Sequence, residues 1–436
     1  MSTTQSWMSA YQSRVRALPG AGAPWLAAVR QRAIERFVDE GWPTLKQEGW
    51  RTTSLAELEQ QNFTTPGAAL SPAALIEQLR GNEPGHWLVF VDGRYAPELS
   101  AVGKLPDGSQ VCALSSVLNG HPEQVEPYFG VEQDGSTPSA LNLAMAADGG
   151  FVSIGAGRDI DLPINLVFVA VTAQSACFPR NLIIAQAGSH ATVVEHYIGS
   201  DGGATLTNAV TRAFISADAN ITHLKLQQES DKAFHMAAID VMQERGSVYN
   251  SHSLSFGAHF ARNDIETQFR GDGCETLFNG LYYVDGRRHV DHHTLIDHAK
   301  PSGSSREFYR GILAGGARGV FRGRIRVAQG ADRTDALQRT DSLLLSRLAK
   351  ADARPELEIY AEDVKCAHGA TIGQLDDASL FYLRTRGIEE DRARSLLTYA
   401  FAAEVLGRIE IEPLRKRAAW AIRALLPGGE SLEELA

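Results

Sequence analysis

The sequence predicts an all-β core with helical ends, in the form of a β-solenoid, and two observations lead to this fold class. Between residues 87 and 366, apolar and polar residues alternate with a period of two, whereas the flanking regions show the helical period. In DIETQFRG (264–271), for example, Ile265, Thr267 and Phe269 share one face. Candidate strands also recur about every 9–17 residues, as in all-β units. Their predicted first residues are Leu182, Ala191, Asn208, Asn220, Phe234, Ser247, Phe260, Glu275, His289, Ser305 and Ala317.

Two other architectures compete with the solenoid. No helical stretch is visible between these strands, which argues against a sheet built from βαβ units. A β-sandwich is the remaining alternative, but few connections have the Asn-Gly or Asp-Gly pairs of tight hairpins. Continuous strand spacing favours stacked coils, although no short sequence repeat is visible.

The first 86 residues are expected to form a mainly helical region. PWLAAVRQRAIERFVDEG (24–41) begins with a proline, which a first helical turn tolerates, and ends at a glycine. PAALIEQLRG (72–81) also ends at a glycine. Residues 42–55 lie between these helices and lack periodicity, so we interpret them as a packed connector in preference to a binding site.

The last 70 residues, 367–436, are predicted to be helical again. A first helix (376–387) begins with capping aspartates and ends at Gly387, and others follow at 389–409 and 414–426. The apolar stripe predicted for the second helix consists of Leu396, Ala400, Ala403 and Leu406. These helices are expected to cap the open core of the solenoid, to offer a groove or ridge to another protein, or both.

Composition excludes several classes of protein. With 436 residues, 44% of them hydrophobic and 22% charged, the chain resembles an ordinary globular protein of two or three structural units. Its formal net charge of −10 argues against nucleic-acid binding. The sequence shows neither a membrane-spanning run nor a signal-peptide pattern, so a cytoplasmic location is expected. Its four cysteines form no CxxC pair and predict no disulfide framework.

Common catalytic motifs are missing. The chain has no GxxxxGK[ST] or GxSxG segment, and SIGAGRDI (153–160) has Ile160 where a dinucleotide fingerprint needs its third glycine. We therefore predict no ATP or NAD site, so any ATP hydrolysis must come from another chain. The acidic pair at 389–390 is interpreted as helix-start charge. A carboxylate pair formed between coils stays an open alternative.

Four histidines lie close together in RRHVDHHTLIDH (287–298). In a strand, His289 and His293 would share one face about 13 Å apart, and His292 and His298 would share the other. One strand cannot bring them to a single ion, so polar ladder and turn residues are the favoured interpretation. Ligands from neighbouring coils would reverse it.

The segment KCAHGATIGQ (365–374) places a thiol and an imidazole one residue apart, before an apparent glycine-rich turn. At the end of a strand, Cys366 and His368 would project from one face about 6.6–7 Å apart. They suit iron, zinc or sulfur species, and Lys365 is expected to lower the pKa of the thiol. Judged from these residues alone, a small buried cysteine and a turn-bonding histidine are favoured.

The longer segment KCAHGATIGQLDDASLFYLRTRGI (365–388) resembles the C-terminal signature of the SufD family, part of the SUF machinery for iron–sulfur cluster assembly. PTLKQEGWRTTSL (43–55), VDHHTLIDHAKPSGSSREFYRGIL (290–313) and DALQRTDSLLLS (335–346) are similar to further family segments, so the resemblance covers nearly the whole chain. In the resemblance, SufB-like paralogues have an acidic HEAT-like sequence where this chain has HGAT (368–371). They also have a cysteine in the segment that corresponds to 338–343, and this chain has no cysteine there. Ala367 and Asp341 depart from the commoner serine and asparagine.

This resemblance implies a right-handed parallel β-helix (87–366) between helical regions 1–86 and 367–436. It also implies a heterodimer with a SufB-like paralogue and a SufC-like ABC ATPase docked on the C-terminal helices. His368 and Cys366 would then lie at the interface with the paralogue, help to form the nascent cluster and act as metal ligands shared with that partner. The residues expected to bind partners are Asp376, Leu380, Phe381, Tyr382, Arg386 and Gly387.

The same resemblance implies a non-catalytic subunit. Such a chain holds no cofactor stably, and iron, sulfide or a cluster is bound only transiently at the interface. A purely structural subunit of the complex is one alternative, and an independent β-helix enzyme acting on carbohydrate is a more distant one. Whether the isolated chain forms a homodimer is left open.

Overall fold

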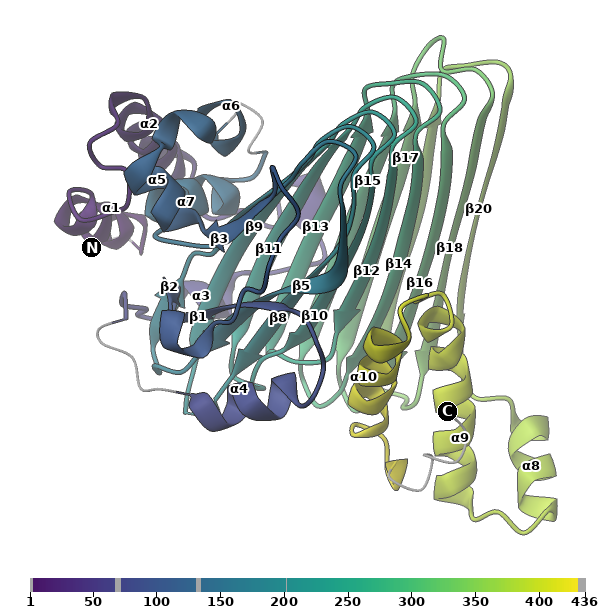
Figure 1. Ribbon diagram of the computed structural model, residues 1–436. Helices are drawn as coiled ribbons and strands as arrows, with labels where there is room; N and C mark the ends of the chain where they lie inside the picture. The colour runs from purple at the N-terminus through teal and green to yellow at the C-terminus, as the bar shows by residue number, and fades with distance from the viewer. Residues whose placement is uncertain (1–2, 67–71, 131–134, 201, 430–436) are drawn as a thin grey trace.

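The computed structural model describes residues 3–66, 72–130, 135–200 and 202–429, and its core is the predicted parallel β-solenoid (Figure 1). The strands are β1 (His86–Val91), β2 (Arg94–Tyr95), β3 (Gln110–Ala113), β4 (Gly150–Ile154), β5 (Asp159–Ala170), β6 (Ser175–Cys177), β7 (Arg180–Ala185), β8 (His190–Gly199), β9 (Thr205–Ile215), β10 (Asn220–Gln228), β11 (Phe234–Gln243), β12 (Val248–Ser255), β13 (Phe260–Phe269), β14 (Glu275–Val284), β15 (His289–His298), β16 (Ser304–Leu313), β17 (Arg318–Val327), β18 (Thr334–Leu344), β19 (Lys350–Ile359) and β20 (Val364–Gly373).

Two sheets enclose the core. Sheet 1 has the order β2-β1-β5-β8-β10-β12-β14-β16-β18-β20, and sheet 2 has the order β19-β17-β15-β13-β11-β9-β7-β4-β3, with β6 beside β9. From β7 to β20, successive strands alternate between the sheets, so each coil adds one strand to each. Neighbouring coils pair in parallel register, for example Gln338 beside His368. Inward side chains of each coil therefore stack on those of the next.

The predicted strands agree closely with the observed ones. The largest difference among the predicted first residues is at β9, which begins at Thr205 rather than Asn208. In β13, Ile265, Thr267 and Phe269 are buried as the alternation predicts. The pattern succeeds because each strand has one face in the core and one outside it.

No helix separates the predicted strands from Leu182 onward, as expected, but the predicted β region from residue 87 also contains a helical stretch, between β3 and β4. This stretch forms α5 (Leu114–Gly120), α6 (Glu126–Phe129) and α7 (Thr137–Met145). Every residue of α7 is buried, so the helix lacks the polar face that makes a helix visible in a sequence. The side-chain amide of Asn142 donates to the carbonyls of Pro179 and Asn208, which fastens α7 to the sheet.

The N-terminal region contains α1 (Thr3–Arg14), α2 (Pro24–Glu40), α3 (Ala56–Glu59) and α4 (Ala73–Arg80). Helix α2 begins at Pro24 and ends at Glu40, just before Gly41, as predicted. Gly41 itself has a positive φ of 72°. Helices α1, α2, α5 and α7 share a core with β4, β7 and β9, so they cover the first coils of the solenoid (Figure 1). The predicted connector is packed as expected, since Trp50, Thr53 and Leu55 are buried.

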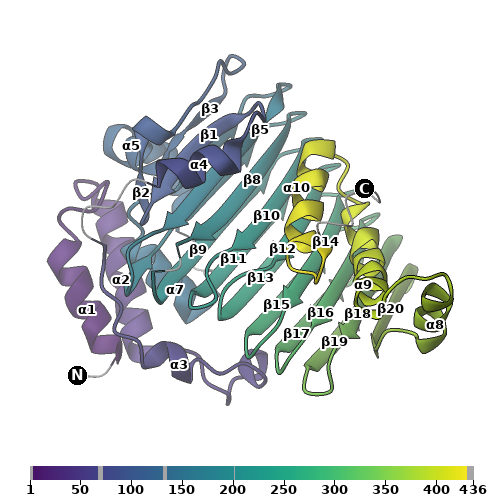
Figure 2. The same ribbon diagram turned by 90° about the horizontal axis from the view of Figure 1, so that it is seen from below.

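The C-terminal region contains α8 (Asp377–Thr385), α9 (Glu390–Leu406) and α10 (Glu412–Arg423). The expectation that these helices cap the open core is wrong. Helices α9 and α10 lie on the outer face of sheet 1, against Leu224, Leu226 and Leu254, while α4 lies farther along the same face (Figure 2). Among the described residues, no helix is long and apolar enough to cross a membrane.

The predicted apolar stripe of α9 is also wrong in part. Leu406 is buried, but Ala400 is exposed, and the buried face instead carries Ser395, Thr398 and Tyr399 together with Ala402. Polar side chains can lie on this face because they find partners, as when the Ser395 hydroxyl donates to the Pro427 carbonyl at 2.8 Å.

Candidate functional site at the open end of the solenoid

The solenoid ends without a cover. Within the part of the chain that the structure describes, β20 pairs only with β18, and β19 pairs only with β17, so each sheet has a free edge at this end. Residues 367–373 of β20 are all exposed. A long exposed strand edge presents unpaired backbone groups that another chain can pair with. We call the outer edges of β19 and β20 the open end.

Cys366 and His368 lie on β20, the last strand at this open end. The strand continues to Gly373, so the predicted glycine-rich turn and the change to helix after residue 366 are wrong. The glycines lie within the strand, where Gly369 pairs with Arg339. The partly buried Cys366 packs against the solenoid core, and strand alternation places His368 on the same, inward side of β20. The two side chains therefore share a face, as predicted.

The Cys366 thiol is less acidic than an ordinary cysteine. Its burial raises the pKa, and the nearby Asp335 carboxylate adds to the effect. The expected lowering of this pKa by Lys365 is wrong, because adjacent residues of a strand point to opposite faces. The raised pKa keeps the thiol protonated near neutral pH.

A polar contact on the outer face anchors β20 to β18. The Thr371 hydroxyl donates to Oδ1 of Asp341 at 2.5 Å. Asp341 also accepts from Arg339 at 2.9 Å and lies 3.6 Å from Arg310. The Asp341 carboxylate thus links the last two strands of sheet 1.

The residues expected to bind a partner lie on or beside α8. Asp376 caps the helix by accepting from the Ser379 backbone N–H at 2.9 Å, and Gly387 follows its C-terminus with a φ of 83°. The Leu380 side chain packs inward, whereas Phe381 and Tyr382 are 70% and 57% exposed. Arg386 is also expected at this surface, and its guanidinium lies over the Tyr382 ring, 5.2 Å from the ring centroid.

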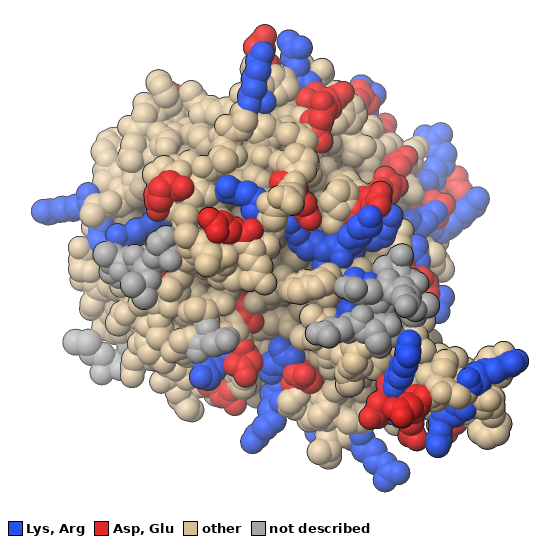
Figure 3. All heavy atoms as spheres, turned by 60° about the horizontal axis from the view of Figure 1, so that its bottom comes forward, with Lys and Arg blue, Asp and Glu red and all other residues tan. Residues whose placement is uncertain are grey.

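Charge does not gather into a single patch on the face that carries α4 and the C-terminal helices. Figure 3 shows acidic and basic side chains interspersed over it, with uncharged surface between them. An aromatic pair such as Phe381 and Tyr382 is therefore the more distinctive feature of the C-terminal region.

The four histidines of β15 alternate as predicted, and they do not converge. His289 and His293 lie on the outer face, where His289 contacts the Thr53 hydroxyl, whereas His292 and His298 are fully buried. Among the described residues, no group of three or more His, Cys, Asp or Glu side chains is arranged to hold a metal ion.

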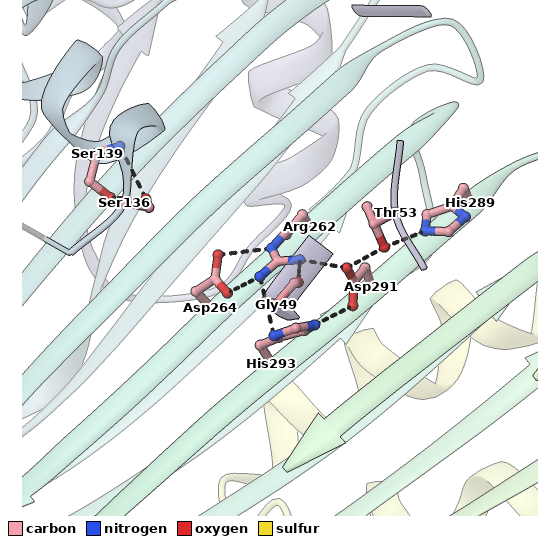
Figure 4. A network of polar contacts seen from close by, with 9 residues as sticks. All are labelled: Gly49, Thr53, Ser136, Ser139, Arg262, Asp264, His289, Asp291 and His293. Atoms are coloured by element: carbon pink, nitrogen blue, oxygen red, sulfur yellow. Dashed lines mark hydrogen bonds and ion pairs between the residues drawn. The ribbon is translucent and has the colours of Figure 1, made fainter. Parts of the chain in front are cut away.

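His293 instead belongs to a network that joins the N-terminal connector to sheet 2 (Figure 4). Asp291 accepts from Arg262 at 2.7 Å and from Thr53 at 2.6 Å, and lies 3.1 Å from His293. Burial opposes ionisation of Asp291, but Arg262 and His293 hold its pKa well below the usual range. Arg262 also donates to the Gly49 carbonyl at 2.8 Å. The network is structural in character because its contacts fasten Gly49 and Thr53 of the connector to β13 and β15.

Sequence reasoning missed a buried ionic cluster inside the middle coils. Glu195 lies 3.2 Å from His223, Glu229 lies 2.8 Å from His235, and Lys225 Nζ lies 2.7 Å from the other nitrogen of His235. Burial lowers the pKa of Lys225 to about 8. The signal was the alternation in HLKLQ (223–227), in which His223, Lys225 and Gln227 point inward while Leu224 and Leu226 meet the C-terminal helices.

Known protein families match both halves of the chain. A family model described as the SufBD protein N-terminal region covers residues 1–166, and one described as the SufBD core domain of SUF-system FeS cluster assembly covers residues 168–401. The second model alone spans more than half of the 436 residues.

Individual relatives match over nearly their whole length. The iron–sulfur cluster assembly protein SufD of Escherichia coli (strain K12) is 31% identical over 92% of this chain and 93% of its own length. A SufBD family protein of Synechocystis is 31% identical over 89% of this chain and 88% of its own length. SufD of Bacillus subtilis is 26% identical, with 90% and 92% covered. The resemblance to SufD that the 365–388 segment indicated is confirmed, and the chain belongs to the SufBD family of iron–sulfur cluster assembly proteins.

Proposed function

We propose that this chain is the SufD-type subunit of a cluster assembly complex and that its open end receives a SufB-like paralogue. The carrying observation is that both sheets have free edges beside Cys366 and His368. A paralogue with the same solenoid would extend both sheets by strand addition, which satisfies the free backbone groups. A second copy of this chain is the competing occupant when the paralogue is absent.

At that interface, His368 and Cys366 would help to accept iron or sulfur while a cluster is formed. Imidazole is a borderline ligand and thiolate a soft one, and both suit iron. Two side chains do not complete the coordination of a metal ion, so the partner supplies the remaining ligands. In this proposal the cluster is cargo, held transiently, and this chain carries no resident cofactor and no catalytic residue.

The test is His368→Ala, expressed in the native host and purified anaerobically by affinity. We expect the paralogue and an ABC-type ATPase to co-purify with both the variant and the wild type. Iron–sulfur enzyme activity in the cells should fall by about tenfold or more, since loss of a metal-site group has effects of this size. Replacement of the exposed His121 by alanine is the matched control.

If His368→Ala leaves those enzyme activities unchanged, the chain acts as a purely structural subunit. That alternative keeps the heterodimer and the ATPase dock but gives the histidine no part in assembly. Recovery of the chain without a paralogue at physiological salt would contradict the heterodimer itself.

We further propose that α8 is the main docking element for the ATPase. The ATPase would hydrolyse ATP, because this chain has no ATP-binding motif of its own. The support is the exposure of Phe381 and Tyr382 beside Arg386. Aromatic residues and arginine commonly dominate protein interfaces. The double variant Phe381→Ala/Tyr382→Ala should abolish ATPase co-purification and retain the paralogue. Deletion of all three helices is a poorer test, because α9 and α10 cover apolar residues of sheet 1.

A further inference from the structure

Gln338 lies directly behind His368 in the solenoid. It is on β18, its Cα is the register partner of the His368 Cα on β20, and its side chain is fully buried. Adjacent strands are about 4.8 Å apart, so side chains at paired positions of one face lie within reach of each other. The amide of Gln338 is therefore the inward neighbour of the His368 imidazole.

The orientation of this amide is set by Glu307, the next residue in the same row. Glu307 is the register partner of Gln338 on β16 and is also fully buried. The Gln338 Nε2 donates to Oε2 of Glu307. When Glu307 is ionised, its carboxylate only accepts hydrogen bonds, so the nitrogen of the amide then faces Glu307 and Oε1 faces elsewhere.

Gln338 Oε1 is a buried acceptor without a donor. Within the described residues it has no hydrogen-bond partner, and it has no contact with solvent. A buried acceptor in this state costs stability unless a donor reaches it. The His368 imidazole, on the neighbouring strand, also has no hydrogen-bond partner among the described residues, and it carries an N–H donor.

The opposite sheet leaves space for this amide. Gly323 on β17 faces Gln338, and a Cβ at that glycine would lie 2.1 Å from Nε2. The φ of Gly323 is not in the left-handed region, so the backbone does not require a glycine there. The missing side chain is instead explained by the room that the Gln338 amide occupies.

We propose that Gln338 is a positioning residue for His368, whose ring N–H donates to Gln338 Oε1 so that the other ring nitrogen points toward the partner chain. Glu307 acts by holding the amide in the required orientation. Rotation of the exposed His368 side chain toward the core forms this contact. Metal-binding histidines commonly use their second nitrogen in this way, which fixes the tautomer and the ring orientation. The inference rests on the proposed role of His368.

The experiment is ¹⁵N NMR of the full-length chain with labelled histidine, recorded at pH 8. Burial raises the pKa of Glu307 to about 7, so its carboxylate form prevails at that pH. The His368 signals are identified by their absence in His368→Ala. In the wild type we expect one ring tautomer to dominate, and Gln338→Met should change the tautomer ratio by about threefold or more.

Three variants keep this test specific. Glu307→Gln retains an acceptor for the Gln338 amide and should preserve the wild-type tautomer ratio, whereas Glu307→Leu releases the amide and should behave as Gln338→Met does. Leu337→Ala, on the outer face of the same strand, is the control. Circular dichroism and a thermal melt establish that each variant is folded. An identical tautomer ratio in the wild type, Gln338→Met and Glu307→Leu would overturn the inference.

This readout is separate from the test of the proposed function. A shifted tautomer in Gln338→Met supports the contact even where His368→Ala leaves cluster assembly unchanged, in which case only the proposed function fails. If both hold, Gln338→Met should also lower iron–sulfur enzyme activity in cells by about tenfold, as loss of a supporting residue commonly does.

Discussion

The two ends of the solenoid are built differently. At the first end, all six residues of β7 are buried, and helices α1, α2 and α7 share a core with the first coils. At the other end, no residue of β20 is buried, and residues 367–373 are exposed. The chain therefore covers one end by itself and leaves the strands of the other exposed.

The position of the C-terminal helices sharpens this contrast. They follow β20 directly and could have covered it, yet α9 and α10 return to the outer face of sheet 1 and pack on Leu224, Leu226 and Leu254. A chain that only needed to protect its last coil would have used them there. Their absence from the open end suits an interface.

The largest expected effect is at the covered end. Phe37→Ala removes a ring that is fully buried against Trp42, with centroids 5.0 Å apart, and should lower the free energy of unfolding by about 3–5 kcal/mol. Leu348→Ala in the last coil, where Leu348 is 72% exposed, should change it by less than about 0.5 kcal/mol. Urea unfolding measures both. Equal losses would mean that the two ends do not differ in packing.

The next effect concerns the ion pairs on sheet 2. Arg262→Met leaves the fully buried Asp291 carboxylate without its nearest cation and should cost about 3–5 kcal/mol. Arg324→Met, whose pair with Glu356 near the open end is partly exposed, should cost less than about 1 kcal/mol. The same unfolding experiment tests this, and a small loss in Arg262→Met would show that the Figure 4 network contributes little.

A pH effect is expected from the coil just behind the open end. Burial raises the pKa of Glu307 from 4.5 to about 7, so between these values the folded chain binds more protons than the unfolded chain. Stability should therefore fall as the pH rises through this window, by up to about 3 kcal/mol. Glu307→Gln should remove that part of the decline. The exposed Glu275→Gln is the control, and a decline that persists unchanged in Glu307→Gln would contradict the assignment.

The smallest expected effect on the isolated chain is at the open end itself. Ile359→Lys/Ile372→Lys adds charge at positions that are 39% and 49% exposed and should change stability by less than about 0.5 kcal/mol. If a SufB-like paralogue docks at the open end as proposed, the same change should abolish its binding, because it would place two charges in that interface. A pull-down at physiological salt measures this. Retained binding would place the paralogue elsewhere on the chain.

The sequence predicted the coils well because alternation reports which residues share a face. It does not report which face is inside. In β10, the leucines point outward to α9 and α10, while His223 and Lys225 point inward to the ionic cluster. For the same reason the stripe of α9 was misplaced, since its buried face is partly polar.

The candidate site was predictable only in its local part. Cys366 and His368 share a face because they are two residues apart on a strand. Two features depend on the register between coils about 30 residues apart: the position of their strand at the open edge, and the position of Gln338 behind His368. The sequence shows no repeat from which this register could be predicted. Helix α7 was missed because burial on every side removes periodicity.

The return of the C-terminal helices to sheet 1 also sets an order of events during synthesis. Leu226 leaves the ribosome roughly 180 residues before Val405, which packs in the same cluster. At about 5–20 residues per second, the outer face of these coils is exposed for on the order of 10–40 s before its cover has been made. The nascent solenoid thus presents an apolar surface to chaperones and to other chains throughout that interval. The exposure ends only when the last helices emerge.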